Sequence, residues 1–488
     1  MKRLQLEQCG SAMQGKILVL AAIFVTVLVL SLSTVAAAKT VHVPKPTGVP
    51  SVDWHNIQAT LDSAKAGDKV RFRKGVYVLG TDSDFLVVDA PQIRLIGHQR
   101  GTTIIGGQVL PIEGEPGSPY LGGNRSLLQS PPRGFHLTGD KQSISNIRFE
   151  GFRTSILIGF GNFVDTGGYV VEDCEFIDSM YGIQAHVESD DVSAIRGNSF
   201  INNMYGYMIS GGKYHVSYNY SASPEPERIP VDGYTHASGS LQAGNPFFGS
   251  PFFDEGQAPI SENNVFEHNI VDGVEDGIQL AALPGGLIRN NLIRNNEFHD
   301  MTFWGTMAFI ASLGGDAVGN AFVDNKVDGS WSEGFLILNF AGASVDGNVL
   351  VGNEMTSILG VFGDGVYIWG ATNTILLDNI INGVNPGALG YGAVFEGGHS
   401  NQFLLNDTDA DTAALFFYSP DGLFAADSPA DVAVDEIDNP VESIDPNQDF
   451  TRLLSCKEIL TEPDADSSIA EQVLGFRSCV DVALEEPQ

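Results

Sequence analysis

The 488-residue sequence predicts an all-β protein whose short parallel strands stack into a solenoid with about three strands per turn. Three observations support this prediction. A short motif with Asn or Asp before an apolar residue recurs along the chain, and a glycine followed by alternating apolar residues recurs in phase with it. The strands that these motifs imply are only about 4–6 residues long, which is too short for helical periodicity.

The Asn-containing motif sets the repeat. Successive copies lie 24 to 32 residues apart, except for one step of 66 residues, and periods of about 20–50 residues are typical of solenoids. The copies end at Phe176, Phe200, Phe266, Phe298, Phe322, Leu350 and Ile381. Asn tolerates the left-handed backbone of a sharp bend, and stacked Asn amides can bond to one another. We therefore expect a single Asn column at one bend of each turn, formed by Asn198, Asn264, Asn296, Asn320, Asn348 and Asn379.

The glycine motif predicts which side chains point outward. Because strand residues alternate, the first and third residues after each glycine should face the core, and the second and fourth should face out. The motif begins at Gly182, Gly206, Gly277, Gly305, Gly334, Gly365 and Gly392. The predicted outward stripe is polar at Gln184 and His186 but apolar from Met307 to Trp369.

An apolar outward stripe of this length predicts a cover, because a large exposed apolar patch is a site of association. Three protein covers fit: the irregular segment 218–261, which is rich in Pro and aromatic residues, the tail of the chain, or a partner subunit. A polysaccharide is a further candidate, because aromatic rings stack on the apolar faces of sugars. In that case Phe309, Tyr367 and Trp369 are substrate-binding residues.

Residues 1–38 are predicted to be a signal peptide. Basic residues, the last of them Lys16, precede an apolar run over Ile17–Leu32, and an Ala-x-Ala pattern ends at Ala38. An uncleaved membrane anchor is the alternative, since residues 17–38 are uncharged and long enough to cross a bilayer. Both interpretations predict a secreted, periplasmic or cell-surface protein, which meets a membrane only through this segment if it stays uncleaved.

The composition limits the partners. Asp and Glu number 60 against 26 Lys and Arg, and the resulting charge of −34 argues against nucleic acid as a partner. Solubility, adaptation to high salt or bound calcium would each account for this acidity. Residues 421–488 are predicted to be an acidic C-terminal cap in which Cys456 and Cys479 form a disulfide. Cys174 lies in an apolar stretch and is predicted to be a buried thiol.

The first residues after the signal peptide add a family resemblance. "IQATLDSAKAGDKVRFRKGVYVL" (Ile57–Leu79) predicts a short helix that caps the open end of the stack, followed by strands. Together with "LIGHQRGTTIIGG" and units such as "DGIQL", it resembles right-handed parallel β-helix proteins of the pectate-lyase-like superfamily over residues 41–406. The resemblance implies a right-handed parallel β-helix over residues 39–420 with an insertion at 218–261.

This superfamily contains polysaccharide lyases, glycoside hydrolases, sugar epimerases and non-catalytic surface proteins, so the resemblance does not define one activity. No specific enzyme family is matched. The Asp pair in "DDVSAIRGNS" falls beside a different strand from the pair of polygalacturonase-type hydrolases, and the motifs of calcium-dependent lyases and of epimerases are absent.

Polar residues near the insertion form the predicted site. A lyase needs a base and a cation that neutralises the uronate carboxylate. The predicted catalytic residues are Lys213, His215, Asp190 and Asp191, with His186 and Arg228 as further substrate-binding residues. The predicted calcium ligands are Glu188, Asp190 and Asp191, of which the two Asp could instead act as an acid–base pair.

These features give two functional hypotheses. The first is an exported protein that binds or degrades polysaccharide, by lysis or hydrolysis if it is an enzyme. The second is a non-catalytic surface or periplasmic protein used in binding or adhesion, which the apolar stripe and the absence of a recognised catalytic motif favour.

Overall fold

The structure is a computed structural model. It describes residues 38–80, 83–99, 101–107, 132–223, 237–244, 259–274, 276–301, 308–312, 314–330, 333–339, 344–358, 363–384, 390–410, 413–417, 422–424, 432–434, 442–443, 451–462 and 467–485. The chain divides into a short unit, Met1–Thr40, and a main unit, Val41–Gln488, and the fold below is that of the main unit. The signal-peptide prediction lies outside the described residues, apart from Ala38. Within the described ranges, no helix is both long and apolar enough to span a membrane.

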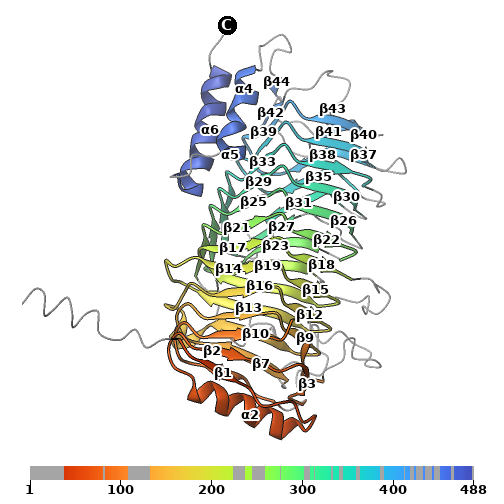
Figure 1. Cartoon of the computed structure of the whole chain (residues 1–488). Coiled ribbons are helices and arrows are strands. Elements are labelled where there is room, and N and C mark those ends of the chain that lie inside the picture. Colours follow the sequence, from red (N-terminus) through yellow and green to blue (C-terminus); the bar gives the residue numbers. More distant parts are fainter. Residues whose placement is uncertain are drawn as a thin grey trace, which may run out of the picture. The chain divides into compact units, whose positions relative to one another are not determined.

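The described strands form parallel sheets that rise together as a stack of turns (Figure 1). Sheet A contains β1 (Thr40–His42), β2 (Lys69–Arg71), β5 (Arg94–Ile96), β8 (Ser143–Ser145), β11 (Val170–Glu172), β14 (Ser193–Arg196), β17 (Tyr214–Ser217), β21 (Val265–Glu267), β25 (Leu292–Arg294), β29 (Ala321–Val323), β33 (Val349–Val351), β36 (Ile375–Leu377), β39 (Asn401–Leu404), β42 (Gly422–Phe424) and β44 (Glu442–Ser443).

Sheet B contains β3 (Gly75–Val78), β6 (Thr102–Ile105), β9 (Arg148–Glu150), β12 (Glu175–Ile177), β15 (Ser199–Ile201), β18 (Tyr220–Ala222), β22 (Ile270–Asp272), β26 (Glu297–Met301), β30 (Lys326–Ser330), β34 (Glu354–Thr356), β37 (Ile380–Val384) and β40 (Asp407–Ala410). Sheet C contains β4 (Leu86–Val88), β7 (Arg133–Leu137), β10 (Thr154–Gly159), β13 (Tyr181–Val187), β16 (Tyr205–Gly211), β19 (Ala237–Ala243), β23 (Asp276–Ala282), β27 (Ala308–Ser312), β31 (Phe335–Asn339), β35 (Val366–Trp369), β38 (Tyr391–Glu396), β41 (Ala413–Phe417) and β43 (Val432–Val434).

A short sheet D holds β20 (Ile260–Glu262), β24 (Leu287–Arg289), β28 (Asp316–Val318) and β32 (Val345–Asp346). Most turns therefore contribute one strand each to sheets A, B and C, and the middle turns add a fourth strand in sheet D. The predicted all-β solenoid with about three strands per turn is confirmed. A short 3₁₀ turn, η1 (Gly161–Phe163), follows β10.

The N-terminal helix is α2 (Pro50–Ser63), which begins seven residues before the predicted start, with Pro50 in its first turn. The buried carboxylate of Asp53 fixes it to the first turn of the stack. Asp53 accepts hydrogen bonds from the backbone N–H groups of Thr47 (2.7 Å), Gly48 (3.1 Å) and Val78 (3.1 Å). Figure 1 shows α2 at the open end of the stack, where it covers the first strands.

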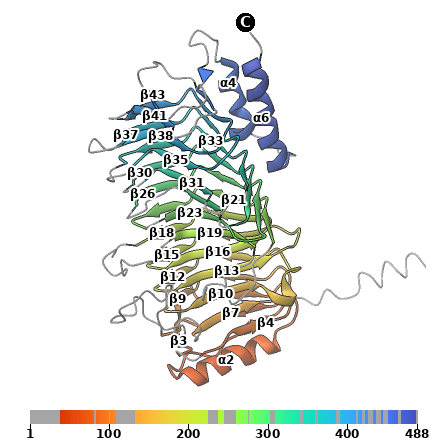
Figure 2. The ribbon, with the colours of Figure 1, turned by 180° about the vertical axis from the view of Figure 1, so that it is seen from behind.

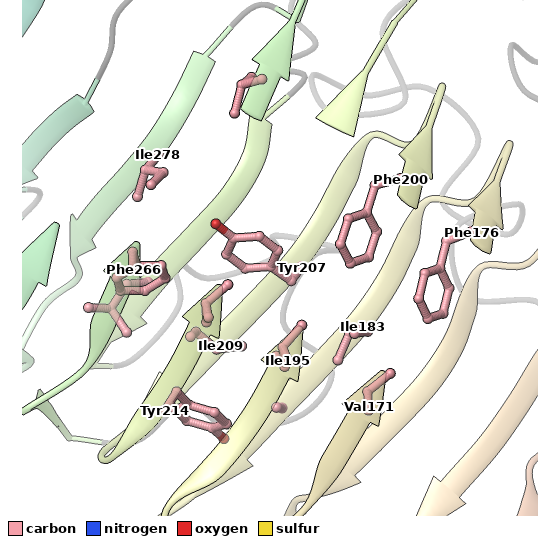
Figure 3. Close-up of a cluster of buried hydrophobic side chains, with 14 of the residues drawn as sticks. Val171, Phe176, Ile183, Ile195, Phe200, Tyr207, Ile209, Tyr214, Phe266 and Ile278 are labelled. Carbon is pink, nitrogen blue, oxygen red and sulfur yellow. The ribbon is translucent and has the colours of Figure 1, made fainter. Parts of the chain in front are cut away.

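The inward side chains form one continuous hydrophobic core, as the alternation predicts. In sheet B, Phe149, Phe176 and Phe200 stack face to face on successive turns, with ring centroids 5.2 and 5.0 Å apart. In sheet C, Ile183 and Tyr207 are aligned inward neighbours and both are fully buried. Figure 3 shows Phe176, Phe200, Ile183 and Tyr207 inside the turns.

The segment 218–261 is not a single irregular insertion, because β18 and β19 lie within it and β20 begins in it. The sequence of β19, "ASGSLQA", lacks the expected apolar residue at its first inward position, which is Gly239. A Cβ at Gly239 would lie only 1.9 Å from the ring of Tyr207, one turn below. The large Tyr207 side chain thus fills the core space of two turns. Because Gly239 then stands where an apolar side chain was expected, the strand is hard to recognise in the sequence.

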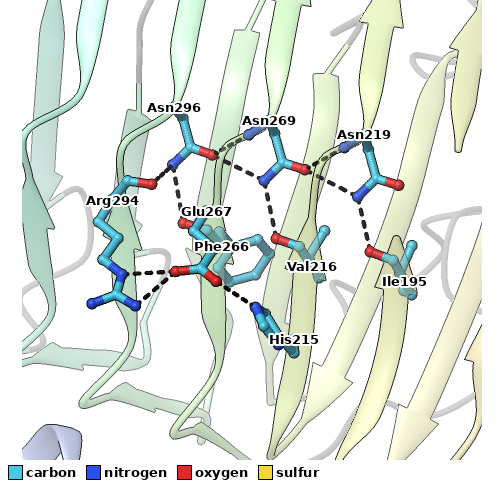
Figure 4. Close-up of polar contacts among 9 residues, drawn as sticks. All are labelled: Ile195, His215, Val216, Asn219, Phe266, Glu267, Asn269, Arg294 and Asn296. Carbon is cyan, nitrogen blue, oxygen red and sulfur yellow. Dashed lines mark hydrogen bonds and ion pairs between the residues drawn. The ribbon is translucent and has the colours of Figure 1, made fainter. Parts of the chain in front are cut away.

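The Asn residues form two columns instead of one. The first lies between sheets A and B and runs through Asn198, Asn219, Asn269, Asn296, Asn325, Asn353, Asn379 and Asn406, and each side-chain amide donates to the next Oδ1 at 2.7–3.0 Å. The second lies between sheets D and A and runs through Asn264, Asn291, Asn320 and Asn348. Figure 4 shows part of the first column.

The predicted single column is therefore wrong, and so is the predicted role of its backbone. The residue before each column Asn adopts the left-handed conformation, as Asn295 (φ 52°) does before Asn296 and Gly319 (φ 64°) before Asn320. The column Asn is buried instead, and its amide satisfies backbone groups that the bend leaves unpaired. The same local motif occurs at two corners, which explains the uneven steps between its copies.

The C-terminal helices α4 (Thr451–Cys456), α5 (Glu458–Thr461) and α6 (Ile469–Glu485) pack on the outer face of sheet A and do not close the end of the stack (Figure 2). Their apolar residues cover outward side chains of the upper turns, among them Val349, Val351 and Leu377. The predicted disulfide is confirmed, since Cys456 and Cys479 are bonded with an S–S distance of 2.03 Å. The predicted buried thiol, Cys174, is confirmed as well.

Candidate functional site

The outer face of sheet C is the candidate site, and strand pairing fixes which side chains it carries. The first outward column aligns Gln184, Met208, Ser240, Gln279, Phe309, Leu336, Tyr367 and Val394. The second aligns His186, Ser210, Gln242, Ala281, Ala311, Leu338, Trp369 and Glu396. Phe309 pairs with Gln279, two residues out of the predicted register, and its side chain lies outside the described residues.

The lower turns of this face carry polar side chains that are nevertheless buried. Gln184 and His186 are each 7% exposed, and Ser210 and Ser240 are fully buried. Polar groups tolerate burial when they bond to one another. Accordingly Thr154 donates to Gln184 at 2.7 Å.

The same holds two and three turns further up the sheet. Gln242 donates to Ser240 at 3.0 Å, and Gln279 donates to Asp276 at 2.6 Å. The result is a shielded polar band across several turns of the sheet, whose groups can donate and accept hydrogen bonds.

The upper turns of the face are aromatic and apolar. Leu336 and Leu338 are buried, whereas the side chain of Tyr367 is half-buried and that of Trp369 remains 38% exposed. The hydroxyl of Tyr367 donates to a carboxylate oxygen of Glu396, one turn further along the sheet. Trp369 thus offers an accessible ring beside a carboxylate.

A buried acid, Asp364, lies two residues before strand β35, next to Gly365. It is 8% exposed, and its pKa is raised to about 7. Burial is the main cause, and the charge of Glu333 raises the pKa further, against the backbone N–H of Tyr391, which donates to Asp364 at 3.0 Å. A carboxyl group in this state is protonated for part of the time at neutral pH and can act as an acid or a base.

Sequence reasoning missed Asp364 because the alternation was read from the residue after each glycine. The signal was present in "GDGVYIW", where a carboxylate directly precedes the glycine that opens a strand of sheet C. Glu333 and Tyr391 occupy the corresponding place on the neighbouring turns, since the N–H of Gly334 bonds to the carbonyl of Asp364 and that of Gly365 to Tyr391.

Comparison with solved structures bears on this architecture. The A-module of mannuronan C-5 epimerase AlgE6 from Azotobacter vinelandii matches with a TM-score of 0.52 and 14% identity, over 78% of this chain and 95% of that chain. A tailspike protein of Escherichia coli bacteriophage HK620, in complex with a pentasaccharide, matches with a TM-score of 0.51 and 13% identity, over 81% and 72%. This chain is a right-handed parallel β-helix protein.

A third β-helix structure, the DFA-IIIase of Arthrobacter chlorophenolicus A6 without its lid, matches with a TM-score of 0.50 and 12% identity, over 78% of this chain and all of that chain. At such low identities the likeness concerns the fold alone. No family model matches the sequence, and no curated protein matches it either.

The β-helix separates the residues that the sequence grouped into one catalytic site. Lys213 lies at the corner between sheets C and A, where its ammonium group forms an ion pair with Asp190. The hydrogen bond and the charge of Lys213 lower the pKa of Asp190. Asp191 pairs instead with Lys141, 3.0 Å away. Both are exposed ion pairs. Lys213, Asp190 and Asp191 lie at the corners between strands, not on the outer face of sheet C.

The two histidines of the predicted site lie on different sheets. His186 is outward on sheet C, as predicted, and its Nε2 lies 3.0 Å from Glu188. His215 is outward on sheet A, where its Nε2 lies 2.7 Å from Glu267 (Figure 4). Burial opposes the ionised form of Glu267, but hydrogen bonds from Arg294 and His215 prevail and lower its pKa. His215 therefore belongs to an ion-pair network on another face.

The predicted calcium ligands do not converge. Glu188 contacts His186, whereas Asp190 and Asp191 contact separate lysines. Among the residues that the structure describes, no group of three or more His, Cys, Asp or Glu side chains is arranged to hold a metal ion. The remaining predicted substrate-binding residue, Arg228, lies outside the described residues.

Proposed function

We propose that this β-helix protein binds an extended polysaccharide along the outer face of sheet C and cleaves it with Asp364 as the acid. One observation carries the proposal: a carboxyl group with a pKa of about 7 precedes the strand that carries Tyr367 and the exposed Trp369. The names of the similar structures agree with it, because one is a mannuronan epimerase and another is a tailspike bound to a pentasaccharide.

The proposed chemistry follows from the protonation state of Asp364. Cleavage of a glycosidic bond requires a proton on the leaving oxygen as the carbon–oxygen bond breaks, and a carboxyl group with a pKa near 7 retains that proton at neutral pH. A second carboxylate then assists the attack of water on the sugar carbon. Glu333 is the candidate, because it lies on the neighbouring turn beside Asp364 and its charge acts on that carboxyl group.

The polar band of the lower turns is too buried to contact a sugar directly, since Gln184 and Gln279 are each 7% exposed and Ser240 is fully buried. These side chains bond to neighbouring protein groups, so the proposed sugar contacts lie on the upper turns, at Tyr367 and Trp369.

A polysaccharide panel tests this proposal. Reducing ends and unsaturated products are measured for neutral and uronate polysaccharides, with calcium and with a chelator, and binding is measured by affinity electrophoresis. Asp364→Asn is expected to lower cleavage by about 10²-fold or more with binding unchanged, because the acid is lost while the shape remains. Trp369→Ala is expected to weaken binding about tenfold through lost stacking.

Two exposed residues of the C-terminal helices that cover sheet A provide matched controls. Asp481→Asn and Leu474→Ala lie on α6, outside sheet C, and should change neither cleavage nor binding. Cleavage by Asp364→Asn at the parental rate would disprove the acid role. Binding that Trp369→Ala leaves unchanged would disprove the proposed binding face.

The second candidate is a non-catalytic binding protein. It is favoured by the pairing of Lys213, Asp190 and Asp191 in surface ion pairs, which occupies the base and carboxylates that the sequence suggested. Binding that depends on Trp369, without products from any substrate, would establish this alternative.

Export is part of the proposal. The signal-like segment 1–38 and the disulfide between Cys456 and Cys479 support it, since disulfides persist in oxidising compartments. Cell fractionation and N-terminal sequencing of the mature protein test it: an N-terminus near Lys39 in the exported fraction is expected, and an intact, reduced protein in the cytoplasm would refute it.

A further inference from the structure

A groove of about 830 Å³ lies on sheet B, a different face of the molecule from the site on sheet C. Its floor is formed by outward residues of successive strands, including Thr103 on β6, Arg148 on β9, Glu175 on β12 and Ser199 on β15. The groove reaches the corner between sheets A and B at Gly197.

Two tyrosines stand at the upper end of this groove, on the next turn of the β-helix. Tyr220 is the strand partner of Ser199, and Tyr218 follows a strand residue, Ser217, whose carbonyl accepts from the N–H of Gly197 at 3.1 Å. Tyr218 is 64% exposed and Tyr220 is 39% exposed. The groove thus ends at accessible aromatic rings.

The backbone of Tyr218 is unusual for its place in the repeat. It lies in the left-handed column that precedes the Asn column, with φ 55°. Apart from His268 and Leu405, the other members of this column are Asn, Asp and Gly residues, namely Asn146, Asp173, Gly197, Asn295, Asp324, Gly352 and Asp378. A bulky residue in this conformation is strained, and an exposed ring gains little from burial to offset the strain.

The geometry around Tyr218 leaves one ring face available. The ring stacks on His268 of the next turn, with centroids 5.0 Å apart and planes 13° apart. On the preceding turn the equivalent residue is Gly197, which has no side chain to stand against the ring. A flat ligand in the groove would therefore meet the ring of Tyr218 above Gly197 and the ring of Tyr220 beside it.

We propose that this groove is a second carbohydrate site and that it takes a neutral oligosaccharide. Exposed tyrosine rings suit the apolar faces of sugars. The lining carboxylates Glu150, Asp173 and Glu175 outnumber the single arginine, Arg148, which contacts two of them at 3.4 Å. This acidic lining repels uronates but accepts hydrogen bonds from sugar hydroxyls. The proposal is independent of the function proposed for sheet C.

The column itself supplies the sharpest test. Tyr218→Asn places the residue type found at Asn146 and Asn295 in the same backbone conformation, so the variant should fold at least as stably as the parent protein. Binding of cellohexaose, xylohexaose and mannohexaose is measured by isothermal titration calorimetry in a Trp369→Ala background, which removes stacking on sheet C. We expect one of these probes to bind, and Tyr218→Asn to weaken that binding at least tenfold with no loss of thermal stability.

Ile380→Ser is the control, because Ile380 is 40% exposed at the outward position of sheet B that Tyr220 occupies, but on a distant turn. It should bind the oligosaccharide like the parent. The proposal is overturned if Tyr218→Asn binds as tightly as the parent, if no neutral oligosaccharide binds, or if hexagalacturonate or an arginine-rich peptide binds the groove more tightly than the neutral probes. Failure of cleavage on sheet C would leave these results unaffected.

Discussion

Replacing one Asn of the first column by Ala should destabilise this β-helix far more than replacing the exposed Asn that precedes it in the sequence. The side chain of Asn296 is fully buried and takes part in five hydrogen bonds of 2.9–3.0 Å. It donates to Asn325 and to two backbone carbonyls, and its Oδ1 accepts from the backbone N–H and the side chain of Asn269. In Asn296→Ala the buried N–H of Asn269 loses its acceptor.

The magnitude follows from these contacts. An orphaned buried group costs about 1–3 kcal/mol, and each further lost hydrogen bond about 0.5–1.5 kcal/mol where its partner cannot find a substitute. Since the side chain of Asn269 still bonds to Val216, we expect a total loss of about 3–5 kcal/mol in the free energy of unfolding. The matched control is Asn295→Ala, where an exposed residue at φ 52° should lose only about 1 kcal/mol through backbone strain.

Two measurements check the prediction. Urea unfolding compares the two variants, and hydrogen exchange follows the amide of Asn269, because in a repeat structure the damage can remain local. Faster exchange at this amide in Asn296→Ala but not in Asn295→Ala is expected. Equal losses of stability in the two variants, within about 0.5 kcal/mol, would show that the amide column does not support the corner.

Three further predictions concern titration and sulfur chemistry. Because the pKa of Asp364 is raised from 3.8 to about 7 in the folded protein, the free energy of unfolding should fall as pH rises between these values, by a few kcal/mol at most; Asp364→Asn should remove this component of the pH profile, and parallel profiles would contradict it. Replacement of Cys456 and Cys479 by Ser should lower the stability of the helical tail by about 3 kcal/mol, measured by limited proteolysis of the tail and by binding of a hydrophobic dye to the uncovered sheet A; an equally resistant tail would refute it. Cys174, whose pKa burial raises to about 12, should resist alkylation at mildly alkaline pH in the folded protein and react in urea, as mass spectrometry would show; rapid modification of the folded protein would contradict its burial.

The fold could be predicted because each turn repeats the same physical requirement. An inward residue such as Ile183 or Phe176 must be apolar, and its outward neighbour is free to vary, so the alternation survives even where the turns differ in length. The register was harder to predict. "NNVF" and "NNEF" look alike in the sequence, yet Phe266 lies in sheet A and Phe298 in sheet B.

The outward columns could be predicted for the same reason, whereas the chemistry of the site could not. That Tyr367 and Trp369 face outward follows from the alternation along their strand. The partners of Lys213 and His215, however, depend on which turns are adjacent. Asp190 and Glu267 lie 23 and 52 residues away from these partners, and no local pattern relates the pairs. The pKa of Asp364 likewise arises from burial and from residues of the neighbouring turns.

The helical tail shows how much information a short strand can carry. In the lower turns of sheet A the outward positions include polar residues, as in "SIS" (Ser143–Ser145), where both serines face outward. From β29 upward, triplets such as "AFV", "VLV" and "ILL" are apolar at every position, which is typical of strands that are buried on both faces. An apolar triplet in an outward register thus calls for a cover on that sheet.

The tail provides this cover and is held on both sides of it. Lys457 forms ion pairs with Asp324 at 3.2 Å and Asp378 at 3.0 Å, at corners of two different turns. The disulfide joins α4 to α6 above the apolar patch. Because the C-terminal helices lie on sheet A, they cover neither sheet C nor the groove on sheet B. Association of the β-helix with partners is thus directed to these two faces, which carry polar and aromatic side chains.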